Sequence, residues 1–476
     1  MKIILPEGVS YIIHRLEEKG YEAYAVGGCI RDTILGRSPE DWDITTSAKP
    51  QEIKKCFKRT VDTGIKHGTV TVMLNHTGYE VTTYRIDGEY EDGRHPKDVE
   101  FTGNLFLDLE RRDFTINAMA YNEKAGLIDK FGGMQDIRDK TIRCVGDAGK
   151  RFEEDALRML RAVRFSGQLG FRIEDETRNA IVKRVEKLSL ISAERIRAEL
   201  SKLIISKNSG QIYEIYNTGM SSVFLPELDA MMEVRQYNNH HIYTVGEHCI
   251  HSVGVMNLFF GIGSDYIDKS NIPEDVFMRA SDIAKDIDKK GHLALCLTML
   301  FHDIAKPETM TIDDMGTGHF YGHPAVGEKI ADNILRRLTF DNDTITIVKR
   351  LIRFHDYRLE GRLRILRRAV SKIGSDIMLM LFLVQYADIL SQNPDTFEEK
   401  FEKLNAVYEG YEQIINDESP LSLKDLAVNG RDIIEQLGIK PGPEVGKMLK
   451  LLLDTVLEEP EKNNRETLLN MLKGRF

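Results

Sequence analysis

The stretch that decides the fold is YAVGGCIRDTILGRSPEDWDITT, residues 24–46. A short apolar run ends in Gly27-Gly28, a helix-like segment follows, and two acids, Asp41 and Asp43, flank Trp42. Residues two apart on an extended strand point to the same face, so the spacing predicts that Asp41 and Asp43 aim together. Mg²⁺ binds such hard carboxylate oxygens, with phosphate oxygens and waters in its other positions.

The glycine pair predicts a phosphate-binding turn beside these acids. Gly28 can expose a backbone N–H to a phosphate, and Arg31 can add positive charge. A lone D-x-D or a lone Gly-Gly is usually only a solvated turn, but the two features lie within 17 positions of each other. Together they predict metal-dependent nucleotidyl transfer from a nucleoside triphosphate.

Residues 24–46 resemble the class II tRNA nucleotidyltransferase and poly(A) polymerase family. A second motif of that family, RRDFTINA, stands at residues 111–118, and EVTT at residues 80–83 matches the strand that carries its third acid. On its own, a charged residue at the start of a strand is usually solvated. The resemblance implies catalytic roles for Asp41, Asp43 and Glu80, and nucleotide contacts for Gly28, Arg31, Arg112, Asp113 and Asn117.

Length and composition indicate an ordinary globular chain of more than one domain, with 476 residues, 42% hydrophobic and 29% charged. A net charge of −10 argues against a protein coated in nucleic acid but allows a local basic groove. Five cysteines without a C-x-x-C favour a reducing cytoplasm over a disulfide framework. No apolar run is long enough for a membrane span or a secretory signal, so we expect no membrane association.

The elements predict an α+β fold, in which a small α/β head precedes an elongated all-α body. The family resemblance implies that the head is polymerase-β-like and that the body contains an HD domain. Residues 67–74 and 79–84 read as strands around a turn at 75–78, and residues 151–169 and 193–205 read as single amphipathic helices. Residues 85–101 read as a mobile loop. We expect a catalytic head (1–141), a neck that binds nucleobase and RNA (142–240), an HD domain (241–392) and a tRNA-binding tail (393–476).

The helix expected at 151–165, RFEEDALRMLRAVRF, presents charged residues on one face at the helical period. Its plain interpretation is a solvated face with a Glu154–Arg158 pair. However, an aspartate can accept from the exocyclic amine of cytosine or adenine while an arginine donates to the ring nitrogen. Uracil and guanine present the reverse pattern and are rejected. The segment resembles the family's nucleobase motif, which implies Asp155 and Arg158 as base readers and Arg161 and Arg164 as further nucleotide contacts, although Arg164 falls off the polar face. AERIRAEL, residues 193–200, resembles a family motif that braces the neck.

Histidines crowd the middle of the chain. His248, His302-Asp303 and Asp388 follow the order H…HD…D of the HD phosphohydrolase superfamily, which they resemble. A His–Asp pair at the end of an apolar helix must be satisfied, and a metal does this well. The resemblance implies a transition metal there (Ni, Mn, Fe, Co or Zn), with His323 and His355-Asp356 as candidates for a second ion. The alternative for each histidine is a packed or surface residue.

The last part of the chain completes the resemblance, because its VNGRD and PGP pieces are similar to the tails of bacterial CCA-adding enzymes with an HD domain. A basic run at 358–372 is either a solvated face or an RNA contact. The expected activity is CCA addition to tRNA from CTP and ATP with Mg²⁺, in the cytoplasm. A poly(A) polymerase, an A-only-adding enzyme and a chain that acts mainly as an HD phosphohydrolase stay as alternatives, and the oligomeric state is open.

Overall fold

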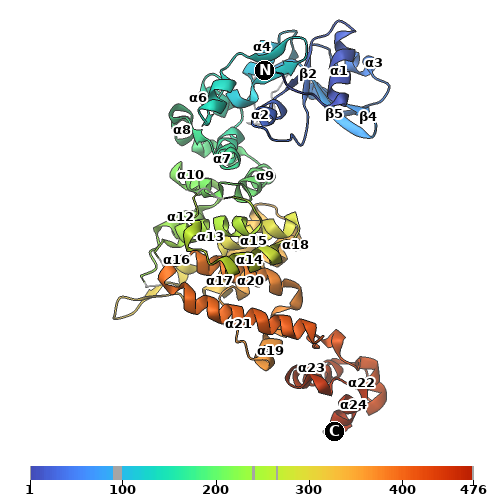
Figure 1. The fold of residues 1–476 in the computed structure, drawn as a ribbon, viewed down its shortest axis with the longest axis vertical. Coiled ribbons are helices and arrows are strands. Elements are labelled where there is room, and N and C mark those ends of the chain that lie inside the picture. The colour runs from blue at the N-terminus through green and yellow to red at the C-terminus, as the bar shows by residue number, and fades with distance from the viewer. Residues whose placement is uncertain (1, 89–98, 238–241, 264–265, 474–476) are drawn as a thin grey trace. The chain divides into compact units, whose positions relative to one another are not determined.

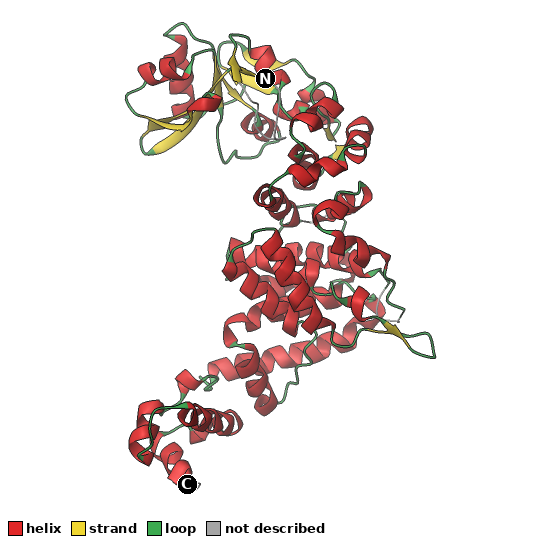
Figure 2. Cartoon of the chain, turned by 180° about the vertical axis from the view of Figure 1, so that it is seen from behind, coloured by secondary structure: helices red, strands yellow, loops and turns green. Residues whose placement is uncertain are grey.

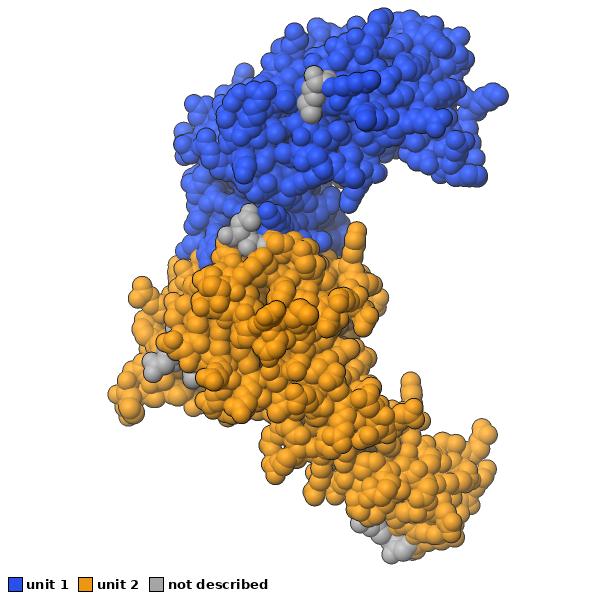
Figure 3. All heavy atoms as spheres, viewed as in Figure 1, with its two compact units in different colours: residues 1–226 blue, residues 227–476 orange. Residues whose placement is uncertain are grey.

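The computed structural model describes residues 2–88, 99–237, 242–263 and 266–473. The chain divides into two compact units, residues 1–226 and 227–476 (Figure 3). The first unit carries the main sheet, and the second is almost entirely helical apart from one small hairpin (Figures 1 and 2). This confirms the expected α/β head followed by a helical body.

The head is built on a seven-stranded mixed sheet in the order β3-β4-β5-β2-β1-β8-β9. Within it, β2 and β5 run parallel, and every other neighbouring pair is antiparallel. The strands are β1 (Ala23–Val26), β2 (Ile44–Thr46), β3 (Thr60–Gly64), β4 (Thr69–Leu74), β5 (Thr77–Thr83), β8 (Met119–Asn122) and β9 (Gly126–Asp129).

The two strands expected from the sequence are present as β4 and β5, with shifted ends. A 3₁₀ turn occupies Ile65–His67, so β4 begins only at Thr69. The connecting turn is shorter than expected because Asn75 and His76 both have positive φ (47° and 66°), which suits a two-residue hairpin turn. As a result, Gly78 and Tyr79 lie inside β5, and Glu80 is a mid-strand residue.

Helices in the head bury one apolar stripe against the sheet. In α1 (Glu7–Glu17), Val9, Ile12, Ile13 and Leu16 recur at helical spacing and are almost fully buried. The other helices of the first unit are α2 (Gly28–Ile34), α3 (Pro50–Cys56), α4 (Leu105–Glu110), α5 (Gly133–Arg138), α6 (Ala148–Glu154), α7 (Leu157–Leu169), α8 (Asp175–Val182), α9 (Ala193–Ile204), α10 (Ile212–Asn217) and α11 (Ser221–Phe224).

The single helix expected over 151–169 is wrong. Asp155 has φ −144° and ψ 102°, an extended conformation that ends α6 before α7 begins. Its carboxylate accepts from the N–H of Leu157 at 3.1 Å, in the manner of a helix cap. An aspartate that competes for backbone N–H groups in this way favours a helix start over a helix interior. The helix expected at 193–205 is confirmed as α9.

In the second unit, four helices pack around a shared apolar interior: α13 (Val245–Phe259), α15 (Lys289–Phe301), α18 (Asn342–Phe354) and α20 (Met378–Leu390). α15 is buried on nearly all sides, which explains its continuous apolar sequence. The remaining helices are α12 (Pro226–Glu233), α14 (Glu274–Ala284), α16 (Lys306–Thr309), α17 (His323–Arg337), α19 (Leu363–Ile373), α21 (Phe397–Asn416), α22 (Gly430–Leu437), α23 (Pro443–Glu458) and α24 (Arg465–Lys473).

No single helix in the described ranges is both long enough and apolar enough to span a bilayer. One broken pair, Leu363–Ile373 with Ser375–Leu390, passes on length and composition alone and bends by 90° at its break.

Candidate functional site

Asp43 and Glu80 are brought together by strand register. Asp43 precedes β2, and its carbonyl still accepts from the N–H of Val26 in β1 at 3.0 Å, so its backbone continues the ladder. Ile44 pairs with Val81 in the parallel β2–β5 ladder, and both side chains are buried. Because side chains alternate along a strand, Asp43 and Glu80 point together to the opposite face. The expectation that Asp41 lies on a strand is corrected: β2 begins at Ile44, and both acids precede it.

The electrostatics of this edge show that the three head acids repel one another. Burial is the largest cause that raises the pKa of Asp43, with Asp41 adding to it and Arg112 opposing it. Burial likewise raises the pKa of Glu80, helped by Asp43 and Asp41. Among the described residues, the groups with three ligand atoms within 4.8 Å all lie in the second unit, so the head acids do not close on one another to that degree. Mg²⁺ does not require this, because it usually takes one or two protein carboxylates plus substrate phosphates and water.

The raised pKa of Asp43 gives a stability prediction. An acid whose pKa is higher folded than unfolded stabilises the fold at low pH and loses that contribution as pH rises through its folded pKa. We therefore expect Asp43→Asn to raise the thermal unfolding midpoint of the Mg²⁺-free protein at neutral pH, with a smaller gain as pH approaches the usual carboxyl range. Scanning fluorimetry across pH in EDTA measures this, and a lower midpoint at neutral pH would contradict it.

An arginine lies against the glycine turn. Gly27 caps α2 with φ 87°, a conformation that favours glycine, and a Cβ there would lie 3.1 Å from Nη1 of Arg112. Arg112 also lies 3.5 Å from the buried carboxylate of Asp108 and lowers the pKa of Asp43. Its Nε is buried and has no hydrogen-bond partner in the described structure. The residue that requires glycine is therefore Gly27, whereas the sequence had singled out Gly28.

A chain of polar contacts links the predicted nucleotide residues. Arg31 donates to the Asn117 side chain at 2.6 Å, and Asn117 donates to Asp113 at 3.0 Å. Arg161 then donates to the other oxygen of Asp113 through Nε (2.9 Å) and Nη2 (2.6 Å). Burial alone would raise the pKa of Asp113, but Arg161 and Asn117 outweigh it and hold that pKa below its usual range. These four residues thus form one preorganised unit.

The two predicted base readers do not pair with each other in the structure. Asp155 accepts two hydrogen bonds from Arg195 of α9, at 3.2 and 2.7 Å. Arg158 is buried and donates to Glu154 at 2.6 Å and to the carbonyl of Arg111 at 3.0 Å. The Glu154–Arg158 pair of the plain interpretation is therefore real, although it bridges a break between helices.

The off-face arginine, Arg164, has a partner that sequence periodicity could not supply. Its Nε lies 2.5 Å from Glu199 of α9, and Arg161 lies 3.6 Å from the same carboxylate. Phe165 lies close to three guanidiniums, with its ring centre 3.7 Å from Arg164, 4.9 Å from Arg31 and 5.3 Å from Arg161. The AERIRAEL motif thus braces this cluster through Arg195 and Glu199, in agreement with its expected role.

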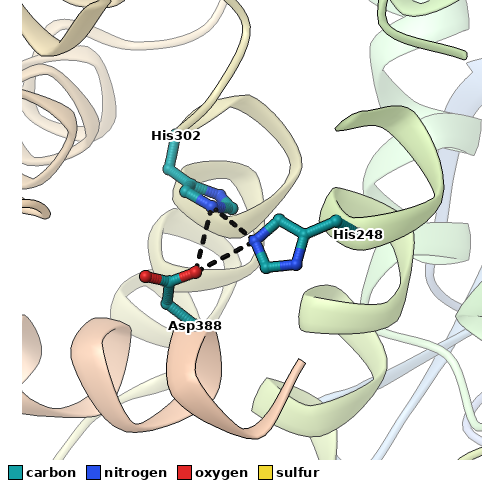
Figure 4. A group of neighbouring side chains, drawn as sticks. All are labelled: His248, His302 and Asp388. Atoms are coloured by element: carbon teal, nitrogen blue, oxygen red, sulfur yellow. Dashed lines mark hydrogen bonds and ion pairs between the residues drawn. The ribbon is translucent and has the colours of Figure 1, made fainter. Parts of the chain in front are cut away.

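The second unit gathers the predicted HD residues from separate helices. His248 of α13 has its Nε2 2.9 Å from Asp388 of α20 and 3.1 Å from Nε2 of His302, which follows α15 (Figure 4). The His302 Nε2 lies 3.3 Å from Asp303 and 3.6 Å from Asp388. Two ligand atoms that share one ion, with bonds of about 2.1 Å, are expected about 3 to 3.5 Å apart. The donor set therefore fits a metal ion.

A second group shares Asp303. The other oxygen of this carboxylate lies 3.3 Å from Nε2 of His323 and 3.6 Å from Nε2 of His355, and these two nitrogens lie 3.1 Å apart. Lys306 lies 2.7 Å from the first oxygen and donates to Gln236 at 2.7 Å. Asp303 thus lies between two potential metal positions. His323 and His355, the extra candidates from the sequence, belong to this second one.

All four imidazoles have the orientation that metal binding requires. Their Nδ1 atoms lie within hydrogen-bond distance of the backbone carbonyls of Ser391, Met299, Phe320 and Ile352, at 2.8 to 3.0 Å. An Nδ1–H that donates to a carbonyl leaves the Nε2 lone pair free for a metal. Burial opposes a charged His302, but Asp303 and Asp388 hold its pKa well above the usual value. Imidazoles that converge beside two carboxylates thus favour positive charge, whether as a proton on His302 or as a bound cation.

The basic run at 358–372 is largely used within the fold. Arg367 is buried and donates to the carbonyl of Leu457 at 2.8 Å. Arg364 lies 3.1 Å from Glu458, which also pairs with Arg368. These contacts hold α19 against α23.

The loop expected at 85–101 begins and ends in a short antiparallel pair, β6 (Arg85–Asp87) with β7 (Val99–Phe101), and its residues 89–98 lie outside the described part of the chain.

Comparison with known proteins covers most of the chain. Residues 23–143 match the poly A polymerase head domain, 170–232 the RNA- and SrmB-binding site of polymerase A, 250–393 the HD domain and 324–472 tRNA nucleotidyltransferase domain 2. The structure of the Bacillus stearothermophilus CCA-adding enzyme in complex with CTP aligns with a TM-score of 0.67 and 28% identity over 99% of this chain and 98% of that one.

The matched spans are thus those of a poly A polymerase head domain and of tRNA nucleotidyltransferase domain 2, each of which covers less than half of the chain.

Curated relatives point in the same direction. The CCA-adding enzyme of Lactobacillus delbrueckii subsp. bulgaricus is 51% identical over 211 residues, which is 44% of this chain and 53% of that protein. The chain thus spans about half the length of the curated relatives it matches. The CCA-adding enzyme of Leuconostoc mesenteroides subsp. mesenteroides is 49% identical over 215 residues, covering 45% and 54% of the two chains.

Sequence reasoning missed several residues of the candidate site in the first unit. Asp108 is fully buried and accepts from Thr45 at 3.0 Å and from Arg111 at 2.8 Å, which fixes the segment that carries Arg112. Arg195, Glu199 and Phe165 contact the predicted nucleotide residues. Local periodicity carries no signal for Arg195 and Glu199, because their partners Asp155 and Arg164 are distant in sequence. The one available signal was the charged AERIRAEL motif itself.

Proposed function

We propose that this chain adds C, C and A to tRNA 3′ ends, using CTP and ATP without a nucleic-acid template. The observation that carries the proposal is the β2–β5 register, which sets Asp43 beside Glu80 with Arg112 against Gly27. The 51% identity to a CCA-adding enzyme over 211 residues supports the same reaction.

In the proposed reaction, the RNA 3′-hydroxyl oxygen attacks the α-phosphorus, and the bond to the β-phosphate oxygen breaks to release pyrophosphate. Asp41 and Asp43 hold Mg²⁺, which when bound supplies charge stabilisation to the phosphate oxygens. Glu80 helps to activate the attacking hydroxyl, and its raised pKa makes it a better proton acceptor. Gly28, Arg31 and Arg112 hold the triphosphate, and Asp113 and Asn117 hold the sugar.

Base selection is assigned to the neck. We propose that Asp155 accepts from the exocyclic amine and Arg158 donates to the ring nitrogen of cytosine or adenine. Arg195 fixes the carboxylate of Asp155, and Glu154 fixes the guanidinium of Arg158, so both groups are held in place before the base arrives. Arg161 acts by holding Asp113, and Arg164 acts through its contact with Glu199.

Asp155→Ala and Arg158→Ala are each expected to relax nucleotide choice. In the wild type, UTP or GTP would leave buried polar groups of Asp155 and Arg158 unpaired, and this penalty excludes both nucleotides. Each substitution removes one of those groups and its penalty, so discrimination of CTP and ATP against UTP and GTP should fall by about a hundredfold or more. Steady-state incorporation of each of the four nucleotides into a tRNA primer measures this. Glu176→Ala, an exposed acid in the first turn of α8, is the control and should keep wild-type discrimination. If both folded variants still discriminate sharply against UTP and GTP, Asp155 and Arg158 have structural roles only.

One assay separates the alternatives within the family. The protein is incubated with tRNA that ends at the discriminator base, or in CC, and with labelled CTP or ATP. Full CCA addition extends the first substrate by all three nucleotides. An A-only enzyme extends only the CC-ending tRNA, and a poly(A) polymerase makes long heterogeneous A tracts.

The four-domain division stays a prediction, as does RNA binding by residues 393–476. We place the activity in the cytoplasm, where the five cysteines, all unpaired, stay reduced.

A second activity is favoured by the HD cluster. We propose that it binds one or two transition-metal ions (Ni, Mn, Fe, Co or Zn) and hydrolyses phosphoesters. Four Nε2 atoms and two carboxylates gather there around two adjacent positions, and so many buried or half-buried metal-binding groups are costly to retain without a cation. The test is hydrolysis of a nucleoside 2′,3′-cyclic phosphate after loading with each metal.

A further inference from the structure

An exposed aromatic pair stands at the mouth of the HD cluster. A cavity of about 360 Å³ opens over the cluster, and its lining includes Asp303, His355, His319, Tyr321 and Arg358. The rings of His319 and Tyr321 are stacked, with centroids 5.3 Å apart and planes 8° from parallel. Tyr321 is 77% exposed. A large exposed aromatic residue beside a polar site is typical of ligand recognition.

The pair is held in place by its surroundings. The Nε2 of His319 lies 2.8 Å from the carboxylate of Asp313, and that carboxylate also accepts from the N–H groups of Met315 and Thr317 at 2.9 Å. The Tyr321 hydroxyl lies 3.3 Å from Nδ1 of His319. His319 therefore backs one face of the Tyr321 ring, and the high exposure of Tyr321 comes from its remaining surface. A fixed ring with an open face can stack on a planar ligand at low entropic cost.

The same short segment also builds the metal site. Phe320 supplies the carbonyl that faces Nδ1 of His323, and the Phe320 ring lies 5.2 Å from the ammonium of Lys306. His323 begins α17 two residues after Tyr321. A ligand group bound at the metals is therefore close to the aromatic pair. Arg358 is exposed on the cavity wall and offers a cation to a phosphate.

We propose that this cavity selects phosphoesters that carry a nucleobase, with the base stacked on Tyr321 and the phosphate between the metal positions and Arg358. The inference rests on the proposed phosphohydrolase and assigns to Tyr321 the role of its specificity-determining residue. His319 and Asp313 are positioning residues, because His319 stacks on Tyr321 and Asp313 holds the His319 ring. Stacking does not read hydrogen-bond patterns, so all four bases should be accepted.

The test uses guanosine compounds, since the proposed neck site rejects guanine. Guanosine 2′,3′-cyclic phosphate is compared with methyl ribofuranoside 2′,3′-cyclic phosphate, which lacks the base, on the Mn²⁺-loaded full chain. Binding of guanosine 2′-monophosphate is measured separately by calorimetry. We expect the wild type to have a lower KM for the guanosine ester than for the methyl ribofuranoside ester. In Tyr321→Ala, this difference in KM and the affinity for guanosine 2′-monophosphate should each fall by about tenfold.

Two variants make the outcome specific. Tyr321→Phe keeps the ring and should keep the preference, and Met315→Ala, at the 91%-exposed hairpin tip outside the cavity, should match wild type. Unchanged affinity in Tyr321→Ala overturns the stacking role even if hydrolysis is normal. Binding that depends on Tyr321 without hydrolysis of either ester supports this inference and instead overturns the proposed hydrolase.

Discussion

Replacing Asp41 or Asp43 with alanine is expected to abolish incorporation of both CTP and ATP while the head stays folded. Each carboxylate is a proposed direct ligand of Mg²⁺, and losing one removes several kcal/mol of transition-state stabilisation, or about a thousandfold or more in rate. Both nucleotides should fail together, because a metal held by these acids would act at the α-phosphate, which CTP and ATP share, and not at the base. Product lengths on a labelled tRNA over a range of Mg²⁺ concentrations measure the effect.

The matched control lies in the same sheet. Asp62 of β3 is an exposed acid that pairs with Lys54 at 2.9 Å, so Asp62→Ala removes a carboxylate from the head without touching the β2–β5 edge. It should retain wild-type incorporation. Asp43→Ala should unfold no earlier than wild type, because removing Asp43 relieves the repulsion among the acids. Near-normal incorporation by either Asp41→Ala or Asp43→Ala would remove the central claim about this site.

Replacing Asp303 with asparagine is expected to empty both metal positions of the second unit at once. Its two oxygens face different histidine pairs, His248 with His302 and His323 with His355. By contrast, Asp388→Asn should weaken only the first position, and His355→Ala only the second. Metal content after loading and desalting, measured by plasma mass spectrometry, should therefore fall in part for the single-position variants and fully for Asp303→Asn.

Charge loss at Asp303 has a second consequence. The variant leaves Lys306 buried with one charged partner fewer, which destabilises the fold, so Asp303→Asn/Lys306→Met is the balanced companion. Nucleotide addition to tRNA should survive in all of these variants, because the head needs only Mg²⁺ and its own acids. Metal content equal to wild type in every variant would make the cluster structural. Lost nucleotide addition in a folded variant would show that the two sites are coupled.

Motifs that are contiguous in sequence could be interpreted from the sequence alone. The D-x-D pair, the glycine turn and RRDFTINA place their groups within one or two turns of backbone, so local geometry already limits where the side chains point. The order H…HD…D likewise predicted which residues meet in the second unit. The same local reasoning failed at Asp155, where a side chain that caps α7 interrupts a pattern that looked continuous.

By itself, then, the sequence determined the head-and-body architecture and the residue types at both candidate sites, because apolar periodicity and motif chemistry are short-range properties. Only the tertiary structure decided which residues are partners. A parallel register sets Glu80 beside Asp43, and Asp303 lies between two histidine pairs. In the neck, Arg195 pairs with Asp155, and Glu199 pairs with Arg164. Such pairings depend on which elements pack together and in which register, and a one-residue shift of β5 against β2 would turn Glu80 to the opposite face.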